Sequence, residues 1–376
     1  MHKILYLIVA SILLTSCVNK TKQTKIESEV NKLEEIGDFK IELGKVSKKS
    51  TFTDRDDITV WGASAIKGED GLYHMFYSRW KKDLGWAWVT HSEIAHAVSE
   101  SPFGPFKYKD VVFPRRGAEY WDGLCTHNPT VHKFDEKYYL YYMGNTGDDL
   151  NPCVPGKIKY NWTHRNNQRI GVAVADDPNG PWKRFDKPLI NASDDEDALD
   201  ALLANNPSIA KRPDGGYLMV YKAVGKKIKR VSGGPVVHCV ATSDNPTGPF
   251  KKYNKPVFEA KGTDFPAEDP YIWYQDGKYR AIVKDMHGAF TDEGQALVLF
   301  ESTDGFDWSL AKNPLVSKLE IKWENGDTLK LKHLERPQLY MENGKPVALF
   351  CAADTLDTKN VLHSWNVQIP LEISKK

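Results

Sequence analysis

One phrase recurs along this chain: an apolar stretch, then a turn rich in proline and glycine that ends on an aromatic residue. Residues 94–106, 170–182 and 237–250 are three copies, and residues 297–308 are a looser fourth copy. Proline and glycine between two apolar stretches are typical of a strand, a tight turn and a second strand. A single unit of this kind cannot bury its apolar face, so the repeat predicts similar units packed side by side.

A second unit alternates with the first and reads as an apolar strand, a turn and an aromatic strand. Its five copies are 61–78, 127–143, 206–221, 269–283 and 336–350. Pairs such as Asp276-Gly277 and Asn343-Gly344 stand between the two strands, as a short hairpin requires. Helical periodicity is hard to find after the N-terminal segment. We therefore predict an all-β fold, a five-bladed β-propeller over residues 50–376, whose inner strand starts converge on one funnel.

The N-terminal segment is typical of an export signal. Met1-His2-Lys3 precedes an apolar run, Ile4 to Leu14, that is too short to cross a bilayer as a helix. Leu14-Thr15-Ser16-Cys17 resembles the lipobox of bacterial lipoproteins, which predicts cleavage before Cys17 and its lipidation, for example with palmitate. An ordinary signal peptide with an incidental cysteine is the alternative. The composition of residues 18–49 predicts a flexible tether. From the signal and the lipobox we expect an exported protein that is lipid-anchored to a bacterial membrane, namely the periplasmic or surface face of the outer membrane.

Composition narrows the class of partner. The chain has 51 basic and 50 acidic residues, and this balance argues against a nucleic-acid binder. Its 11 Trp, 17 Tyr and 15 Phe are more than the core needs, and surplus aromatic residues often line sugar-binding clefts. Cys125, Cys153, Cys239 and Cys351 lack the paired spacing of a zinc site. We expect buried free thiols, with a disulfide between Cys125 and Cys153 as the alternative.

Three motifs carry a resemblance to a known group of enzymes. They are Asn-Pro-Thr-Val at 128–131, Lys-Tyr-Tyr-Leu-Tyr-Tyr at 137–142 and the glycine- and proline-rich copy at 170–182. In order and spacing these resemble the five-bladed propellers of glycoside hydrolase families 43 and 117, over nearly all of the chain after the tether. The resemblance implies a carbohydrate substrate. It also implies carboxylates at several strand starts: an aspartate base in blade one, a second aspartate that orients, and an acid further on.

This sequence departs from that carboxylate pattern. The aligned strand starts are Trp61-Gly62-Ala63-Ser64, Thr126-His127-Asn128-Pro129, Asn205-Asn206-Pro207, Glu268-Asp269-Pro270 and Glu335-Arg336-Pro337. Acids therefore remain only in the last two blades, and hydrolysis of a glycosidic bond normally needs two carboxyl groups. Glu268 and Glu335 would supply them, or Asp54, Asp56 or Asp57 would replace the missing base. The structural alternative for Asp269 and Glu335 is that they hold the propeller together by accepting backbone N–H bonds.

Basic and imidazole groups outnumber acids around the predicted funnel. They are Arg79, His91, His127, His164, Arg165, Lys222, Lys284, His287, His333 and Arg336. Such a set predicts a site for an anionic sugar, a uronic acid or a sulfated sugar, unless the charges are merely solvated on loops. We predict His127, Glu268, Glu335 and His287 as catalytic residues. The predicted substrate-binding residues are Arg79, Trp80, Asn128, Asn206, Lys222, Asp269, Lys284 and Arg336.

The missing aspartates and the cationic funnel favour β-elimination on a uronate over hydrolysis. A cation neutralises the carboxylate, His127 or a tyrosine removes the C5 proton, and an acid protonates the group that leaves C4. A core histidine bonded to the backbone is the alternative for His127. A closed funnel favours chain ends, so we expect an exo-acting lyase or dehydratase that yields a 4,5-unsaturated uronate, with ulvan as the leading substrate by analogy with marine Bacteroidetes.

Two other functions stay open at this point. One is an exo-glycosidase of the family 43 or 117 type, and the other is a non-catalytic glycan-binding lipoprotein with Trp80, Trp86, Trp88 and Trp121 as stacking platforms. No cofactor is required by the sequence. An axial metal ion is left open, because no ligand spacing indicates a particular metal.

Overall fold

The computed structural model describes residues 39–356 and 362–375. It divides into a small unit, Met1–Ile41 with Ile373–Lys376, of which residues 39–41 and 373–375 are described, and a large unit, Glu42–Glu372. The predicted signal peptide and the lipidation site at Cys17 lie outside the described residues. The large unit starts earlier than the predicted boundary at residue 50, because Val46 is buried and its N–H bonds to the Lys322 carbonyl.

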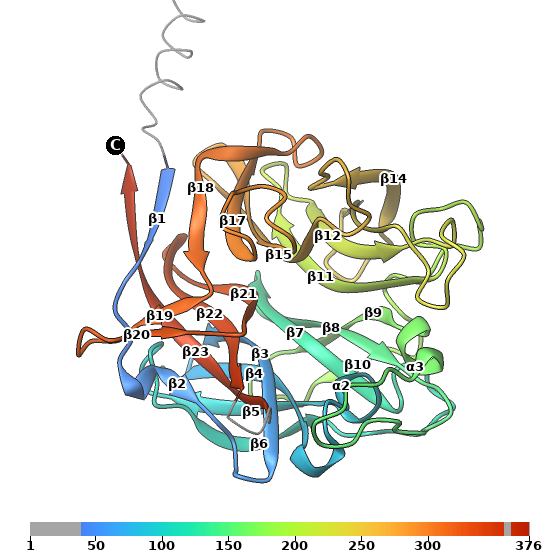
Figure 1. Ribbon diagram of the computed structural model, residues 1–376, viewed down its shortest axis with the longest axis horizontal. Helices are drawn as coiled ribbons and strands as arrows, with labels where there is room; N and C mark the ends of the chain where they lie inside the picture. Colours follow the sequence, from blue (N-terminus) through green and yellow to red (C-terminus); the bar gives the residue numbers. More distant parts are fainter. Residues whose placement is uncertain (1–38, 357–361, 376) are drawn as a thin grey trace, which may run out of the picture. The chain divides into compact units, whose positions relative to one another are not determined.

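The large unit is a five-bladed β-propeller, as the repeats predict. Blade I is β3 (Ile58–Lys67), β4 (Tyr73–Lys81), β5 (Glu93–Ser99) and β6 (Lys107–Phe113), and blade II is β7 (Cys125–Phe134), β8 (Lys137–Asn145), β9 (Arg169–Ala175) and β10 (Lys183–Arg184). Blade III is β11 (Leu203–Lys211), β12 (Tyr217–Val224), β13 (Val236–Ser243) and β14 (Lys251–Val257), and blade IV is β15 (Ala267–Gln275), β16 (Lys278–Asp285), β17 (Ala296–Ser302) and β18 (Ser309–Lys318). Figure 1 shows these sheets around a common centre.

Blade V is completed by the N-terminal part of the chain. It contains β21 (His333–Glu342), β22 (Lys345–Leu356) and β23 (Leu362–Lys375), and β2 (Thr51–Phe52) pairs with β23. Joining an early strand to the last sheet closes the ring of blades and leaves no open seam between blades V and I. β1 (Phe39–Leu43) belongs to the same sheet and lies beside β23, whereas β19 (Glu320–Lys322) and β20 (Thr328–Lys330) form a separate hairpin.

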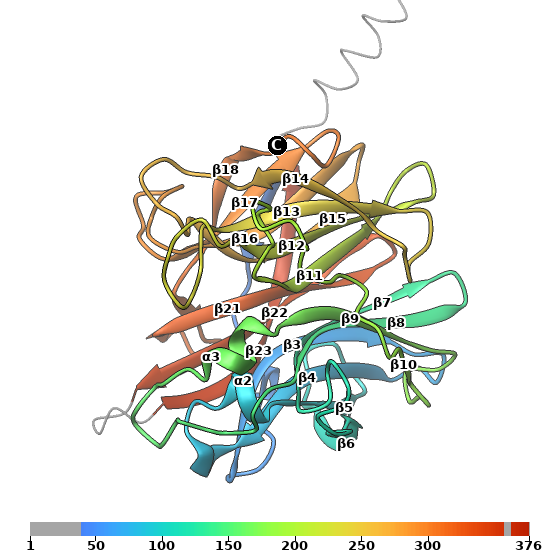
Figure 2. The same ribbon diagram turned by 90° about the vertical axis from the view of Figure 1, so that its right-hand side faces the viewer.

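Helices are few and short among the described residues. They are the 3-10 turns η1 (Lys48–Ser50) and η2 (Lys82–Leu84) and the helices α2 (Trp88–His91) and α3 (Trp162–Asn166). The helices α2 and α3 lie side by side in Figure 2 and come from the long loops of blades I and II. These loops therefore meet on one side of the propeller.

Apolar residues that alternate along the strands pack between neighbouring blades. Tyr141 of blade II packs in one cluster with Ile209 and Tyr217 of blade III. Phe52 and Tyr340 of blade V share another cluster with residues of blade I. Each blade thus buries its faces against the next one, which is why the repeat stabilises a closed ring.

The same backbone irregularity occurs at the start of every inner strand. The register shifts at one residue in blade I and across two residues in each of the other blades, and the first of these residues has a positive φ: Gly62 at 46°, Asn128 at 53°, Asn206 at 47°, Asp269 at 53° and Arg336 at 54°. A left-handed residue inside a strand is typical of a β-bulge and turns the local chain direction. The five bulges bring these residues together on the propeller axis.

Hydrogen bonds join this axial ring. Asn128 Nδ2 donates to Asn206 Oδ1 at 2.9 Å, and Asn206 Nδ2 donates to Asp269 Oδ1 at 2.8 Å. Arg336 Nη1 donates to the same Asp269 oxygen at 3.3 Å, and its Nη2 donates to the Asn128 carbonyl at 3.4 Å. Gly62 completes the ring, since a Cβ there would lie 3.2 Å from Arg336 Cγ and from Asn128 Oδ1. The axis is therefore filled by protein side chains.

We predict that Gly62→Ala destabilises the propeller more than Gly71→Ala. Both glycines have positive φ, which costs an alanine about 1 kcal/mol, but a Cβ at Gly71 meets nothing within 4 Å. The alanine at position 62 must also displace the axial arginine. Chemical denaturation should show a larger fall in the free energy of unfolding for Gly62→Ala, and equal losses in the two variants would contradict the packed ring.

Candidate functional site

A cavity of about 430 Å³ lies over the axial ring and is lined by residues of all five blades. The residue just before each left-handed position lines it: Trp61, His127, Asn205, Glu268 and Glu335. The other lining residues are Trp80, Trp86, Trp88, Asn128, Ile158, Tyr160, Trp162, Arg165, Gln168, Asn206, Lys222, Phe265, Asp269, Lys284, Met286, Gln295, Lys332 and His333. The inner strand starts thus converge on one funnel, as the sequence predicts.

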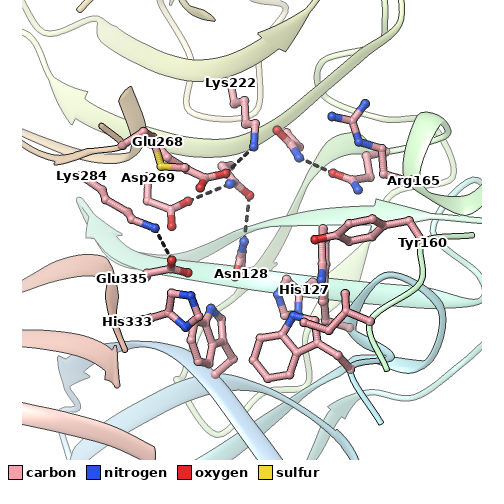
Figure 3. A pocket seen from close by; sticks show the side chains of 18 of the residues that line it. His127, Asn128, Tyr160, Arg165, Lys222, Glu268, Asp269, Lys284, His333 and Glu335 are labelled. Carbon is pink, nitrogen blue, oxygen red and sulfur yellow. Dashed lines mark hydrogen bonds and ion pairs between the residues drawn. The ribbon is translucent and has the colours of Figure 1, made fainter. Parts of the chain in front are cut away.

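Two lysines on second strands form ion pairs with glutamates of the following blades. Lys222 on β12 pairs with Glu268 on β15, and Lys284 on β16 pairs with Glu335 on β21. Figure 3 shows both contacts on one side of the cavity. The two lysines hold equivalent places, because Lys222 lies opposite Asn205 and Lys284 opposite Glu268 in the strand register. Each pair therefore links two blades as well as placing charge in the cavity.

The two glutamates differ in acidity. Burial favours the neutral acid at Glu268, but the positive charges of Lys222 and Lys284 outweigh it and lower the pKa of Glu268 to about 2. At Glu335 burial prevails, and the negative charges of Glu268 and Asp269 add to it, so its pKa is raised above 4.5 despite Lys284. Glu268 is consequently a permanent anion near neutral pH, whereas Glu335 is the better proton donor.

His127 lies on the blade II side of the cavity, at the start of β7. Its Nδ1 is 2.7 Å from Ser92 Oγ, and its ring packs against the rings of Trp88 and Trp80 at centroid distances of 5.2 and 5.9 Å. Burial and the nearby charge of Arg336 hold its pKa well below 6.5. The imidazole is therefore neutral at pH 7, oriented by the serine, and able to accept a proton.

Aromatic side chains form much of the remaining wall. Trp61, Trp80 and Trp86 pack edge to face, with centroid distances of 5.1 Å for Trp61 and Trp86 and 5.3 Å for Trp80 and Trp86. Tyr160 comes from the loop before α3, and burial together with the charge of Glu268 raises the pKa of its hydroxyl. Tyr160 thus keeps its proton and is a hydrogen-bond donor and not a base.

Several predicted site residues lie in or directly beneath this cavity. His127, Glu268 and Glu335 among the predicted catalytic residues line it, and so do Trp80, Asn128, Asn206, Lys222, Asp269 and Lys284 among the predicted binding residues. Arg336 is buried in the axial ring below the floor and forms no part of the lining. Of the other basic groups that the sequence indicates, Arg165 and His333 line the cavity, with His333 Nδ1 2.7 Å from Asp354 Oδ2.

Other predicted residues lie elsewhere. His287 is exposed on the loop after β16 and does not line the cavity, although its neighbour Met286 does. Arg79 is buried on the side of blade I, where it donates to Asp54 at 2.7 Å and to Glu93 at 2.9 Å. His164 is also away from the cavity, because it accepts the Asp149 N–H and bonds to Asn145 through its other nitrogen.

The acids before blade I do not lie in the cavity either. Asp54 is buried between the Tyr77 hydroxyl, at 2.6 Å, and Arg79, while Asp56 and Asp57 are exposed. Trp121 is likewise absent from the lining and stacks on Tyr142 within blade II. All four residues lie between strands, so no inner strand start directs their side chains into the funnel.

Sequence reasoning missed several lining residues on a strand, a helix and loops. Trp61 was considered only as the place of a missing base, and Tyr160, Trp162, Gln168 and Lys332 were not singled out. Trp61 could have been found, since it holds the same place before the left-handed residue as His127. The loop residues carry no repeat signal, so their approach to the cavity is decided by tertiary packing.

The described residues contain no group of three or more His, Cys, Asp or Glu that could hold a metal ion. The four described cysteines, Cys125, Cys153, Cys239 and Cys351, are buried free thiols, as expected from their spacing. Cys125 and Cys153 instead direct their Sγ atoms to carbonyl oxygens, of Trp88 at 3.2 Å and of Lys159 at 2.7 Å. They fix the two loops that border the cavity.

Comparisons with known proteins agree with this architecture. The family model of the glycosyl hydrolases family 32 N-terminal domain matches residues 208–365, less than half of the chain. The structure is similar to a family 117 glycoside hydrolase of the marine bacterium Zobellia galactanivorans, with a TM-score of 0.59, 17% identity, and coverage of 89% of this chain and 91% of that one.

Family 43 structures are similar as well. A thermostable family-43 glycoside hydrolase gives a TM-score of 0.51 at 12% identity, over 86% of this chain and 92% of that one. An arabinanase of Bacillus subtilis gives 0.52 at 14% identity, over 82% and 97%. The chain shares the fold of these propellers. This confirms the predicted resemblance to families 43 and 117, and identities this low establish the fold alone.

Two further searches give no match or candidate. A search of curated protein sequences finds no significant match. Within residues 39–356 and 362–375, no helix is long and apolar enough to cross a membrane.

We predict that Lys222→Met destabilises the protein by about 1–3 kcal/mol at pH 7, because it leaves the largely buried Glu268 carboxylate without its hydrogen-bonded partner. The ion pair stabilises the fold fully above pH 4.5, and this contribution is lost as the pH falls through about 2. The difference between the variant and the parent should therefore shrink in acid. Denaturant unfolding at several pH values measures it.

Lys226→Met is the matched control, since Lys226 pairs with Glu196 on the surface and that pair is worth less than about 1 kcal/mol. An equal fall in the free energy of unfolding for the two variants would show that the pair of Lys222 with Glu268 does not stabilise the protein more than a surface pair.

Proposed function

We propose that this protein is a carbohydrate-active enzyme that acts at the end of an oligosaccharide bearing a uronic acid, and that its reaction is β-elimination. One observation carries the proposal. All carboxyl groups that line the cavity among the described residues come from blades IV and V, and the wall formed by blade II offers the neutral imidazole of His127. Hydrolysis requires two carboxyl groups that flank the bond, whereas elimination requires one base and one acid around an anchored carboxylate.

The cations of the cavity anchor the substrate in this proposal. A lysine ammonium has three donors, so Lys222 and Lys284 each keep donors for a uronate after bonding to their glutamates. Arg165 also lines the cavity, near Tyr160 in Figure 3, and adds a planar guanidinium. Binding the carboxylate to these groups stabilises the negative charge that develops when the C5 proton leaves.

The pKa shifts of His127 and Glu335 then assign the two proton transfers. His127 takes the proton from C5, the C4–C5 double bond forms, and the bond from C4 to its oxygen breaks. Glu335 donates its proton to that leaving oxygen, which its raised pKa favours. The products are a 4,5-unsaturated uronate and either a shortened sugar chain, for a lyase, or water, for a dehydratase.

The axial ring supports action at chain ends. Asn128, Asn206 and Asp269 form the cavity floor and leave no passage along the axis for a continuing polysaccharide. An exo mode on short acidic oligosaccharides such as those of ulvan is therefore part of the proposal. Export and lipid anchoring through Cys17 fit this role, because polysaccharides are degraded outside the cell.

An exo-glycosidase is the second candidate, and the different acidities of Glu268 and Glu335 favour it. Glycoside hydrolysis uses one ionised carboxylate and one protonated acid, and Glu268 and Glu335 would fill these two roles. Its weak point is that both carboxyl groups come from adjacent blades. The glycosidase names of the similar structures support carbohydrate as the substrate class for both candidates.

A single assay separates the candidates. The purified protein is incubated with uronate-ended and neutral oligosaccharides while the ultraviolet absorbance of a conjugated double bond and the product masses are recorded. Elimination gives new absorbance with no added water, hydrolysis adds one water without absorbance, and a glycan-binding protein that stacks sugars on Trp80, Trp86 and Trp88 gives binding without turnover. Products with added water and no absorbance would overturn β-elimination.

We predict that His127→Ala lowers kcat by about 100- to 10,000-fold, the usual contribution of a general base. His287→Ala is the matched control, because this histidine is exposed and lies outside the cavity, and its variant should retain the parent rate. Steady-state kinetics on a uronate-ended oligosaccharide measures both. Full activity of His127→Ala would remove the proposed base.

The pH dependence gives an independent prediction. The lowered pKa of His127 keeps the base form present below pH 6.5, so the acidic limb of the kcat/KM profile should lie below that value. Loss of the Glu335 proton sets the alkaline limb, above pH 4.5. Glu335→Gln should lower the rate and abolish the alkaline limb. An unchanged limb in that variant would exclude Glu335 as the acid.

A further inference from the structure

A second cavity of about 350 Å³ adjoins the first and is not used by the proposed reaction. Its lining residues are Thr59, Lys82, Gly85, Trp86, Val154, Pro155, Gly156, Lys157, Ile158, Lys332 and Leu356. Trp86, Ile158 and Lys332 line both cavities, so the two hollows meet along these side chains. The volume lies within the range of about 300–1,000 Å³ that is usual for small-molecule sites.

The charged residues that line this second cavity are all positive. Its charged lining residues are Lys82, Lys157 and Lys332, and no carboxyl group of the described residues joins them. None of the three lysines forms an ion pair with a described residue. In the main cavity, by contrast, Lys222 and Lys284 are each paired with a glutamate. Three ammonium groups around one hollow, with no ion-pair partner among the described residues, favour an anionic guest.

The loop of residues 150–160 forms the wall between the cavities. Its cavity-lining residues include exposed large apolar side chains: Val154 at 50%, Ile158 at 55% and Tyr160 at 42%. Exposed apolar groups beside a polar cavity are typical of a ligand contact surface.

The backbone of this loop is nevertheless fixed. Asn151 donates to the Leu84 carbonyl at 3.0 Å, and Cys153 Sγ bonds to the Lys159 carbonyl at 2.7 Å. A Cβ at Gly85 would lie 2.6 Å from the Val154 carbonyl, so the loop packs directly on the chain after η2. The second cavity is thus a formed site between the loops of blades I and II, with Lys332 and Leu356 on the blade V side.

We infer that the second cavity is a binding subsite for the sugar next to the one that reacts, and that it recognises an anionic substituent, a sulfate ester or a carboxylate, on that sugar. The inference rests on the proposed function, because the terminal uronate would occupy the main cavity. A chain leaving that cavity past Trp86 and Ile158 places its next sugar between Lys82, Lys157 and Lys332. Trp86 supplies a ring at the junction, where a sugar face can stack.

The test compares the affinity of the protein for three oligosaccharides that share a terminal uronate. The neighbouring sugar carries a sulfate ester in the first, a carboxylate in the second and no charge in the third. Calorimetry measures binding directly, and steady-state kinetics gives KM separately. We expect the parent protein to bind at least one anionic oligosaccharide more tightly than the neutral one, and the two anionic arms show which substituent is preferred.

The variant Lys82→Met/Lys157→Met removes two of the three charges and keeps the length of the side chains. We expect the preference for the anionic over the neutral oligosaccharide to fall roughly tenfold, as expected for the loss of charge-assisted hydrogen bonds. The matched control is Lys226→Met/Lys255→Met, in which two surface lysines that pair with Glu196 and Asp307 are replaced. The control should keep the parent preference.

The outcomes separate this inference from the proposed reaction. A preference unchanged in Lys82→Met/Lys157→Met, or a parent protein that binds all three oligosaccharides equally, would overturn the subsite. Loss of the preference in Lys82→Met/Lys157→Met but not in the control variant supports the subsite. This holds even when no eliminated product is formed, since binding is measured without turnover. Absence of turnover with such selective binding would count only against the proposed β-elimination.

Discussion

The axial ring of left-handed residues is the constraint on which the rest of the structure depends. Each inner strand bends at one position, and the side chains of Asn128, Asn206, Asp269 and Arg336 bond to one another there, with Gly62 leaving them room. Polar groups buried away from water need partners within the protein, and the ring provides them for its own side chains except Asn128 Oδ1 and Arg336 Nε. Because the bend is the same in every blade, the residue before it is delivered to the same cavity each time.

Charge in the cavity follows from the blade arrangement. A lysine on the second strand of one blade reaches the glutamate at the inner start of the next, as Lys222 does for Glu268 and Lys284 for Glu335. The two pairs connect the blades in the same way, yet the pKa of Glu268 is lowered and that of Glu335 is raised. Lys222 and Lys284 both act on Glu268, whereas burial and neighbouring negative charges act on Glu335. Similar repeats therefore produce groups with different proton affinities.

Much of the fold and part of the site could be predicted from residue patterns. Turn pairs such as Asn343-Gly344 mark a hairpin whose two turn residues both have positive φ, as the expected short turn requires. The strand starts gave His127 and Glu335 correct positions in the cavity. Arg79 was misplaced, because a strand residue one position away points to the opposite face. His287 was misplaced as well, because a loop after a strand carries no periodicity that fixes where its side chains point.

The sequence by itself determined the number of blades, the strand starts that meet at the axis, and the absence of acids from three of them, since these follow from local repeats. Only the tertiary structure decided that Lys222 and Lys284 are paired with glutamates, that Tyr160 joins the wall, and that Lys82 borders a second cavity. The physical reason is distance along the chain. Contacts between blades and between long loops depend on packing in three dimensions, which no local pattern of residues records.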